Sequence, residues 1–509
     1  MILITALPVR VACLGFFDLR SALLLLLLAL GGAFCVPVES NAFYSNGRWS
    51  STATDSFAQP AGLPVTLSWS IVPDGSTLLN AVGSQSRSSD LIADLDALFN
   101  YAGGGADLKQ RPWFAYVEQS FERWAEVSGV SLVYEPNDDG VPHGSNANLG
   151  VLGVRGDIRL GGATLDGVGG TYGQSGFIPN ADLTLDTSDV VRFGDAADDY
   201  ALLRNTLMHE AGHSLGLAHM DSSNTHVLMS PFVSNSLSYD GPQLDDIRGI
   251  HSLYGDRHER GALGGNGSFA AATPLGTLLQ GQTITLGLDT PDTVGMVSPG
   301  GEDFVSITGA ADEDFFVLSV AAPIVVDVTL DPRGRNYTER ANSNELYHLV
   351  NASSQSDLLV EVFQAGAAEP LLVASAASAG LGESEQLLGV ALDSPGEYFL
   401  RVAGDSDAVQ LYALTLSARP AKPGDYNQDG LVDAADYTAW RDAVTRGELL
   451  ANETASSGIT DAQDYLAWSE AYGTSPAAAT AAPLPPAIAI AGLLSAIGSL
   501  WRSGDPSRG

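Results

Sequence analysis

The segment His209-Glu210-Ala211-Gly212-His213-Ser214-Leu215-Gly216-Leu217-Ala218-His219 has the spacing of metal ligands. His213 follows His209 by four positions, so on a helix both imidazoles face the same way and can reach one metal ion. Gly216 can take the left-handed backbone that ends a helix, and the resulting turn brings His219 round as a third ligand. Three protein ligands leave a fourth position open, which is typical of catalytic zinc. The segment therefore predicts a catalytic zinc site.

Glu210, next to the first histidine, is the candidate catalytic residue. Its carboxylate can act as general base on a water that the zinc activates for attack on a peptide carbonyl. The alternative is a helix that carries two histidines at this spacing by chance. Gly216 and His219 are also in register, and three of the eight histidines lie in this short segment, so the zinc site is the stronger interpretation.

Two later stretches extend the pattern, namely Val227-Leu228-Met229-Ser230-Pro231 and Leu244-Asp245-Asp246-Ile247-Arg248-Gly249-Ile250-His251-Ser252-Leu253-Tyr254-Gly255. Together with the histidine motif they resemble the matrixin branch of the metzincin zinc peptidases, over residues 63–256. The resemblance implies an α+β catalytic domain with a twisted mixed sheet and three helices. It also implies that Met229 forms the Met-turn beneath the zinc, and that a protein or peptide substrate pairs with an edge strand at 170–175.

The same resemblance implies structural calcium around the glycine-rich loop at 161–176. Asp166 lies in the matching loop, and Asp186 and Asp189 match the two acidic ligands of the family, with Asp189 in place of the usual glutamate. Such an all-oxygen shell suits calcium, while the alternative is that Asp186 and Asp189 only end a strand. Gln174 and Thr184 stand where the family has two histidine ligands of a second zinc. Neither side chain ligates zinc, so we expect a single zinc.

In residues 262–418 the sequence pattern changes to short strand-like segments with turn residues between them. This pattern predicts a β-sandwich accessory domain. Asp312-Glu313-Asp314-Phe315-Phe316 and Gly396-Glu397-Tyr398-Phe399-Leu400-Arg401-Val402 resemble the bacterial pre-peptidase C-terminal domain. Binding of substrate or matrix and a passive spacer are both open as its role.

A small module at 424–473 contains a twelve-position calcium loop. Oxygen ligands fall at Asp425, Asn427, Asp429, Asp433 and Asp436, with glycine at position six for the sharp turn. Aspartate at position twelve resembles dockerin type I modules, which implies a cohesin-like partner; capping of the chain end is the alternative. A second copy, ending at Asp464, has Ala455 where a ligand is needed, so we expect one good calcium site.

Both ends of the chain read as targeting segments. Residues 1–42 have the basic, apolar and small-residue order of a signal peptide, and 43–62 form a short lead-in. Both cysteines, Cys13 and Cys35, fall in this leader, so disulfides cannot hold the mature chain. A linker at 474–486 precedes an apolar tail at 487–509. The tail resembles bacterial surface-sorting signals and allows transient membrane association, with a buried helix as the alternative.

Composition limits the function classes. At 509 residues, the chain is too long for one core. Acidic residues outnumber basic ones 60 to 24, for a net charge of −36, which argues against nucleic-acid binding. The hypothesis is a secreted or cell-surface, bacterial zinc metalloendopeptidase with structural calcium. The alternative is a catalytically lapsed, calcium-dependent adhesion or scaffold protein, against which the presence of all three histidines and Glu210 argues.

Overall fold

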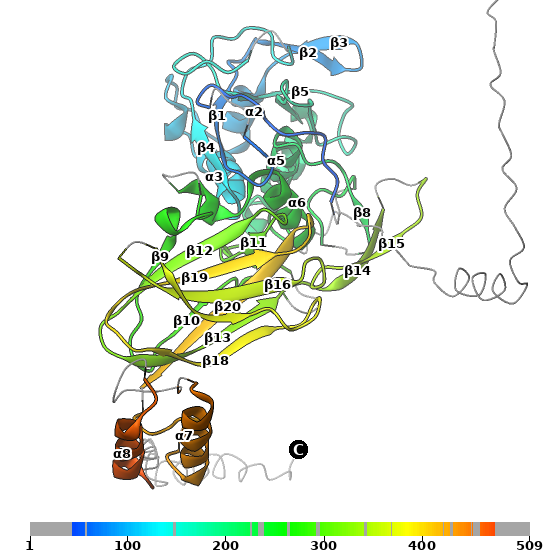
Figure 1. The fold of residues 1–509 in the computed structure, drawn as a ribbon. Helices are drawn as coiled ribbons and strands as arrows, with labels where there is room; N and C mark the ends of the chain where they lie inside the picture. The colour runs from blue at the N-terminus through cyan, green and yellow to red at the C-terminus, as the bar shows by residue number, and fades with distance from the viewer. Residues whose placement is uncertain are drawn as a thin grey trace, which may run out of the picture.

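The computed structural model describes residues 43–55, 59–145, 149–223, 226–232, 239–261, 265–291, 296–340, 344–367, 369–420, 422–427, 431–448, 450 and 459–473. The predicted signal peptide, linker and sorting-like tail lie outside these ranges. Within them, none of the helices combines the length and the hydropathy needed to span a bilayer. Figure 1 shows an α/β part at the top, a β-rich part beneath it and a helical pair at the bottom.

The α/β part is built on a five-stranded mixed sheet in the order β4-β1-β5-β7-β6. Four of its strands run parallel, and the edge strand β6 is antiparallel to β7. The sheet strands are β1 (Val65–Ile71), β4 (Val130–Tyr134), β5 (Ile158–Ala163), β6 (Gly173–Ser175) and β7 (Leu183–Asp186). The edge strand expected at 170–175 is therefore present but shorter.

Three long helices cover this sheet, as expected, with a hairpin and two short helices added. The long helices are α3 (Phe114–Glu126), α5 (Ala201–Ser214) and α6 (Leu244–Tyr254). The additions that sequence analysis did not foresee are β2 (Thr77–Val82), β3 (Gln85–Ser88), α2 (Leu91–Leu98) and α4 (Val190–Phe193). The amphipathic face of α3 explains its position: Val117, Phe121 and Trp124 are at most 1% exposed in the core shared by the sheet and α5.

The β-rich part consists of two five-stranded sheets. One has the order β10-β20-β13-β18 with β11 beside β20, and the other has the order β17-β16-β19-β12-β9. Their strands are β9 (Thr273–Thr277), β10 (Thr283–Leu286), β11 (Val305–Ile307), β12 (Glu313–Val320), β13 (Ile324–Pro332), β16 (Leu358–Gln364), β17 (Leu371–Ala376), β18 (Glu385–Leu392), β19 (Gly396–Gly404) and β20 (Gln410–Pro420). Residues of both sheets share one buried core, which is the packing of a β-sandwich.

The two parts are joined by a continuous packed junction. Val127, Leu244 and Ile247 of the α/β part form one buried cluster with residues of the β-sandwich, namely Val297, Phe304 and Leu411. A hairpin of β14 (Asn336–Arg340) and β15 (His348–Asn351) also leaves the sandwich and pairs with β8 (Asp221–Ser222) of the α/β part. The hairpin projects beside β8 in Figure 1.

The C-terminal module is a pair of helices, α7 (Ala434–Arg446) and α8 (Ala462–Ala471). The two halves contact each other reciprocally. The Trp440 indole donates to the Asp461 carbonyl at 2.9 Å, and the Trp468 indole donates to the Asp433 carbonyl at 2.7 Å. The two halves therefore form one small folded unit.

Candidate functional site

Helix α5 carries the first two histidines, of which His209 is buried and His213 is half-buried. Eleven of its fourteen residues are buried, including His209 and Glu210, so the helix cannot rotate without breaking its packing. The helix ends where Gly216 takes a φ of +106°, a conformation that favours glycine. Leu217 N–H then donates to the Gly212 carbonyl, which closes the turn that leads to His219.

The three histidine side chains converge on one point. The Nε2 atom of His219 lies 3.2 Å from Nε2 of His209 and 3.0 Å from Nε2 of His213. Nδ1 of His209 is 2.6 Å from the Leu228 carbonyl, and Nδ1 of His213 is 2.8 Å from the Leu217 carbonyl. Because a carbonyl only accepts, these two Nδ1 atoms carry the proton and the Nε2 lone pairs face the common point.

This arrangement fits a zinc ion. Tetrahedral bonds of about 2.05 Å place neighbouring ligand nitrogens about 3.3 Å apart, close to the spacing found here. Burial, with the neighbouring His213, lowers the pKa of His209 to about 3, and burial lowers the pKa of His213 to about 4. Both rings are therefore neutral at pH 7, as metal ligands must be. Converging lone pairs repel one another unless a cation lies between them.

Glu210 lies beneath the edge strand of the sheet. Its side chain is 6% exposed, and burial raises its pKa to about 8. A Cβ atom added at Gly173 of β6 would lie 2.8 Å from Glu210 Cγ, so this strand passes directly over the carboxylate. The absence of a side chain at position 173 is what allows the approach.

The Met-turn lies under the histidines. Met229 is 2% exposed, and a Cβ atom at Gly212 would lie 2.5 Å from its sulfur. The methionine therefore packs against α5 at Gly212, and its role as the floor of a zinc site stays a prediction.

Asp246 of α6 holds the Met-turn, a role that sequence analysis missed. Its carboxylate accepts the N–H of Leu228 at 2.8 Å, of Met229 at 3.0 Å and of Gln243 at 2.8 Å. Since the Leu228 carbonyl in turn orients His209, Asp246 supports the site through one residue. Burial raises the pKa of Asp246 to about 7, although the three N–H groups lower it. Gln243 and Asp246 form a capping box at the start of α6, and this local pattern is the sequence signal that could have pointed to Asp246.

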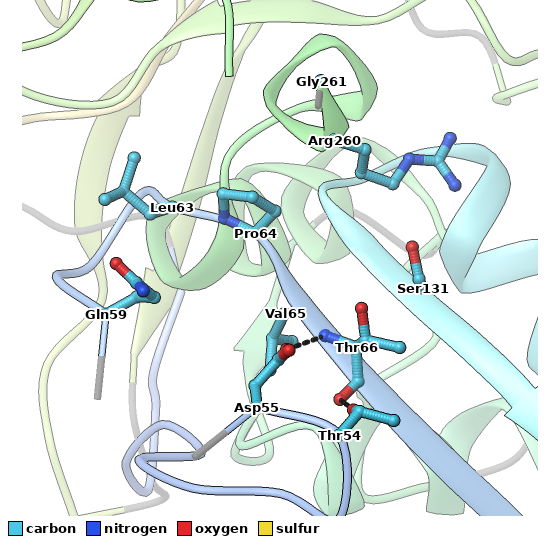
Figure 2. Close-up of a pocket in the computed structure, with 10 residues that line it drawn as sticks. All are labelled: Thr54, Asp55, Gln59, Leu63, Pro64, Val65, Thr66, Ser131, Arg260 and Gly261. Atoms are coloured by element: carbon cyan, nitrogen blue, oxygen red, sulfur yellow. Dashed lines mark hydrogen bonds between the residues drawn. The ribbon is translucent and has the colours of Figure 1, made fainter. Parts of the chain in front are cut away.

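A cavity of about 510 Å³ opens above these residues. Its walls include His209, Glu210 and His219, the stretch from Gly169 to Gly173, and the stretch from Ser230 to Phe232. A cavity of about 520 Å³ lies elsewhere, at the start of β1 (Figure 2). There the Asp55 carboxylate accepts the Thr66 N–H at 2.6 Å, and none of the predicted site residues lines it. The first cavity is therefore the candidate active site.

The predicted calcium residues of the catalytic domain lie around one loop. Asp186 and Asp189 are 0% exposed, the Asp166 N–H donates to Asp186 at 3.1 Å, and the Gly169 N–H donates to Asp189 at 2.7 Å. The described residues do not bring all three carboxylates within 4.8 Å of one another. Gln174 and Thr184 lie opposite each other in the β6–β7 register. The numbers of calcium and zinc ions stay predictions.

A second carboxylate cluster, which sequence analysis missed, lies at the junction of the two parts. Glu259, Asp312 and Asp314 each place an oxygen within 4.8 Å of the others. Glu259 belongs to the short helix η4 (Arg257–Arg260) directly after α6, and the two aspartates belong to the motif that begins β12. Burial raises the pKa of Glu259 to about 9, with further contributions from Asp256 and Asp312.

The C-terminal loop is described in part. Asp436 is 0% exposed, and its carboxylate accepts the N–H of Asn427 at 2.9 Å and of Asp433 at 2.8 Å. Asp425 is also fully buried, whereas Asp429 lies outside the described residues. The described ends of the loop therefore both bond to Asp436, and calcium binding there stays a prediction.

Comparison with known proteins supports the catalytic part. The family model described as Matrixin matches residues 98–255. Interstitial collagenase of Bos taurus is 34% identical over 141 residues; the match spans 27% of this chain and 27% of the collagenase, so this chain covers about a quarter of that relative.

Two solved structures resemble part of the chain weakly. The pre-peptidase C-terminal domain of collagenase from Bacillus anthracis is 14% identical, with a TM-score of 0.17, and the match covers 29% of this chain and 94% of that domain. The lysozyme inhibitor PliG of Aeromonas hydrophila is 15% identical, also with a TM-score of 0.17, over 29% of this chain and 97% of PliG. Scores this low leave the β-sandwich to be argued from its own strands. Residues 98–255 form a matrixin-like domain, and the family match supports a metalloprotease.

Proposed function

We propose that this chain is a secreted, zinc-dependent endopeptidase. The observation that carries the proposal is the convergence of three histidine Nε2 atoms beside a buried carboxylate in an open cavity. His209, His213 and His219 would hold the zinc. When bound, zinc supplies a Lewis acid that polarises the peptide carbonyl and makes a water more acidic.

The chain's own residues would transfer the protons and hold the ligands in position. Glu210 accepts a proton from the attacking water as the new C–O bond forms, and returns a proton to the amine as the C–N bond breaks. Burial favours the protonated carboxyl that this second step needs. The Met-turn and Asp246 keep His209 in place throughout.

Strand β6 offers the surface for the peptide. It ends the sheet order, so its outer edge has no strand partner among the described residues. An extended peptide can add to this edge through backbone hydrogen bonds, which puts its scissile bond over Glu210. The cavity wall at Ser230 to Phe232 would then receive a side chain.

Calcium, export and docking complete the proposal. The buried carboxylates of Asp186 and Asp189, both bonded to the 166–170 loop, support a calcium that stiffens the cavity wall. Export rests on the leader-like composition of residues 1–42. A calcium-loaded docking role for 424–473 rests on its loop pattern and on the buried Asp425 and Asp436.

The test is Glu210→Ala, with Glu118→Gln, a half-buried glutamate paired with Lys109 away from the cavity, as the control. We expect Glu210→Ala to keep one zinc per chain and to lose at least about a hundredfold in casein cleavage, because the base contributes to the chemistry and does not bind the metal. Zinc content and cleavage are measured on the same sample. Undiminished turnover in Glu210→Ala, or a parent chain that holds no zinc, would show the proposal to be wrong.

A further inference from the structure

The third histidine lacks the support that the first two have. Nδ1 of His209 and of His213 each meets a backbone carbonyl, whereas among the described residues Nδ1 of His219 meets no acceptor. His219 is also the exposed member of the three. A histidine that binds a metal through one ring nitrogen normally donates a hydrogen bond from the other, and this hydrogen bond fixes the orientation of the ring. The position of His219 therefore depends on the backbone that carries it.

That backbone is held by segments far away in sequence. On one side, the Ala218 N–H donates to the Tyr44 carbonyl at 2.8 Å, and Ser45 forms a bridge with Leu217. Within the turn, the Met220 N–H donates to the Met229 carbonyl at 3.0 Å. The remaining side is held by the β-sandwich.

The β14–β15 hairpin provides this last contact. Strand β14 pairs with β8, which begins two residues after His219, and places Arg340 opposite Asp221. The Arg340 guanidinium contacts the Asp221 carboxylate at 2.6 and 2.7 Å, and the Tyr347 hydroxyl donates to its other oxygen at 2.9 Å. The Ser223 N–H also donates to the Thr338 carbonyl at 2.7 Å.

The hairpin is itself fixed to the catalytic part. The Arg248 guanidinium of α6 donates to the Tyr337 hydroxyl at 3.0 Å and to the Val409 carbonyl at 3.1 Å. Tyr337 packs with Val350 and Ala352 in a small buried cluster that Phe43 covers. Figure 1 shows the hairpin reaching from the sandwich to β8. The hairpin is thus anchored by the buried Tyr337 cluster at one end and contacts Asp221 through the Arg340 ion pair.

We propose that Arg340 and Tyr347 of this hairpin are positioning residues for His219, so that the β-sandwich is part of the catalytic unit. The metal aspect rests on the proposed function. Loss of the Arg340–Asp221 contact frees the segment after His219, and a ligand with no second hydrogen bond then leaves the metal more often. Substitution of groups bonded directly to metal ligands typically weakens metal binding by about 10–100-fold, so groups that act on His219 through Asp221 should have effects at or below the lower end of this range.

The experiment uses the full chain and four variants: Arg340→Ala, Asp221→Ala, the double variant, and Tyr347→Phe. Arg401→Ala is the matched control, since Arg401 is similarly exposed and pairs with Glu313 and Glu361 inside the sandwich. Zinc release to a chelator is timed, and the visible spectrum of the Co²⁺-substituted chain reports ligand geometry. Circular dichroism confirms that each variant is folded.

We expect zinc release to be about tenfold faster in Arg340→Ala, about threefold faster in Tyr347→Phe, and unchanged in Arg401→Ala. The double variant should be no faster than Asp221→Ala, because both act through one contact. The Co²⁺ spectrum should change only in the hairpin and Asp221 variants. Release at the parental rate in both Arg340→Ala and Tyr347→Phe would overturn the inference alone. A parent chain without zinc would overturn the proposed function as well.

Discussion

Gly173→Ala tests whether strand β6 and Glu210 touch as closely as the structure shows. A Cβ atom at this position would lie 2.8 Å from Glu210 Cγ, 3.0 Å from its Oε1 and 3.1 Å from its Cδ. Carbon atoms in contact prefer about 3.5–4.0 Å, so the strand or the carboxylate must move by roughly 0.7 Å or more. Either movement displaces the base relative to the peptide that pairs with β6.

The expected loss falls on catalysis more than on folding. A shift of about 1 Å can cost about a hundredfold in rate, so we expect kcat/KM to fall 10- to 100-fold, about 1.4–2.7 kcal/mol in the barrier. Overpacking costs about 1–3 kcal/mol, but replacing glycine in a strand recovers about 0.5–1 kcal/mol, so the free energy of unfolding should change by less than about 2.5 kcal/mol. Zinc should stay bound because no histidine moves.

The assay measures kcat/KM on a peptide, zinc content and the unfolding midpoint. Gly104→Ala is the control, since a Cβ atom there meets nothing within 4 Å. A folded, zinc-loaded Gly173→Ala chain within twofold of the parental kcat/KM would refute the proximity of β6 and Glu210.

Three further predictions concern the supports of the fold. Asp246→Ala leaves the N–H groups of Leu228, Met229 and Gln243 without an acceptor, so chemical denaturation should show a loss of about 3 kcal/mol, against about 1 kcal/mol for the exposed cap Asp195→Ala. The pKa of Glu259 rises from 4.5 to about 9 on folding, so the folded chain keeps a proton that the unfolded chain releases, and stability falls as pH rises through this window. In calcium-free buffer, Glu259→Gln should therefore raise the free energy of unfolding by more than about 1 kcal/mol at pH 7 and by little at pH 4, whereas Glu302→Gln should leave it unchanged at both. Asp436→Ala should abolish calcium-dependent stabilisation of the C-terminal helices, followed by circular dichroism, while Asp442→Ala, at a half-buried aspartate that pairs with Arg441, keeps it. Equal calcium responses would contradict the loop assignment.

The sequence patterns predicted the helices, turns and strands whose formation depends on interactions between residues close together in the chain. The helix that the spacing of His209 and His213 implies is α5, and the turn at Gly216 has the expected left-handed backbone, because helical spacing and glycine freedom act within a few residues. The strand-like segments expected over 262–418 are likewise present, for example as β13 (Ile324–Pro332) and β19 (Gly396–Gly404). Helix α2 was missed because only Leu91 and Leu95 of its eight residues are buried, which is too short a stripe to recognise.

The supports of the site could not be read locally. Asp246 contacts a turn 17 and 18 residues away, and Arg340 contacts Asp221 across 119 residues. The carboxylates of Glu259 and Asp314 meet only because the junction packs η4 against β12. Contacts of this kind depend on how whole domains dock, and no spacing in the sequence encodes that. The candidate ligands could therefore be named from their spacing, whereas the residues that support them could not.

The dependence of His219 on remote segments has a thermodynamic consequence. Residues 43–509 contain no cysteine, so no covalent link fixes the segment at 216–223. Its partners are Tyr44 and Ser45 near the start of the described chain and Thr338 and Arg340 in the sandwich. If docking of these segments favours the metal-binding position of His219, then metal binding must favour their docking by the same free energy. Zinc affinity and the cohesion of the catalytic part with the β-sandwich are then one linked equilibrium, so a catalytic domain cut away before residue 262 should not hold its metal as the full chain does.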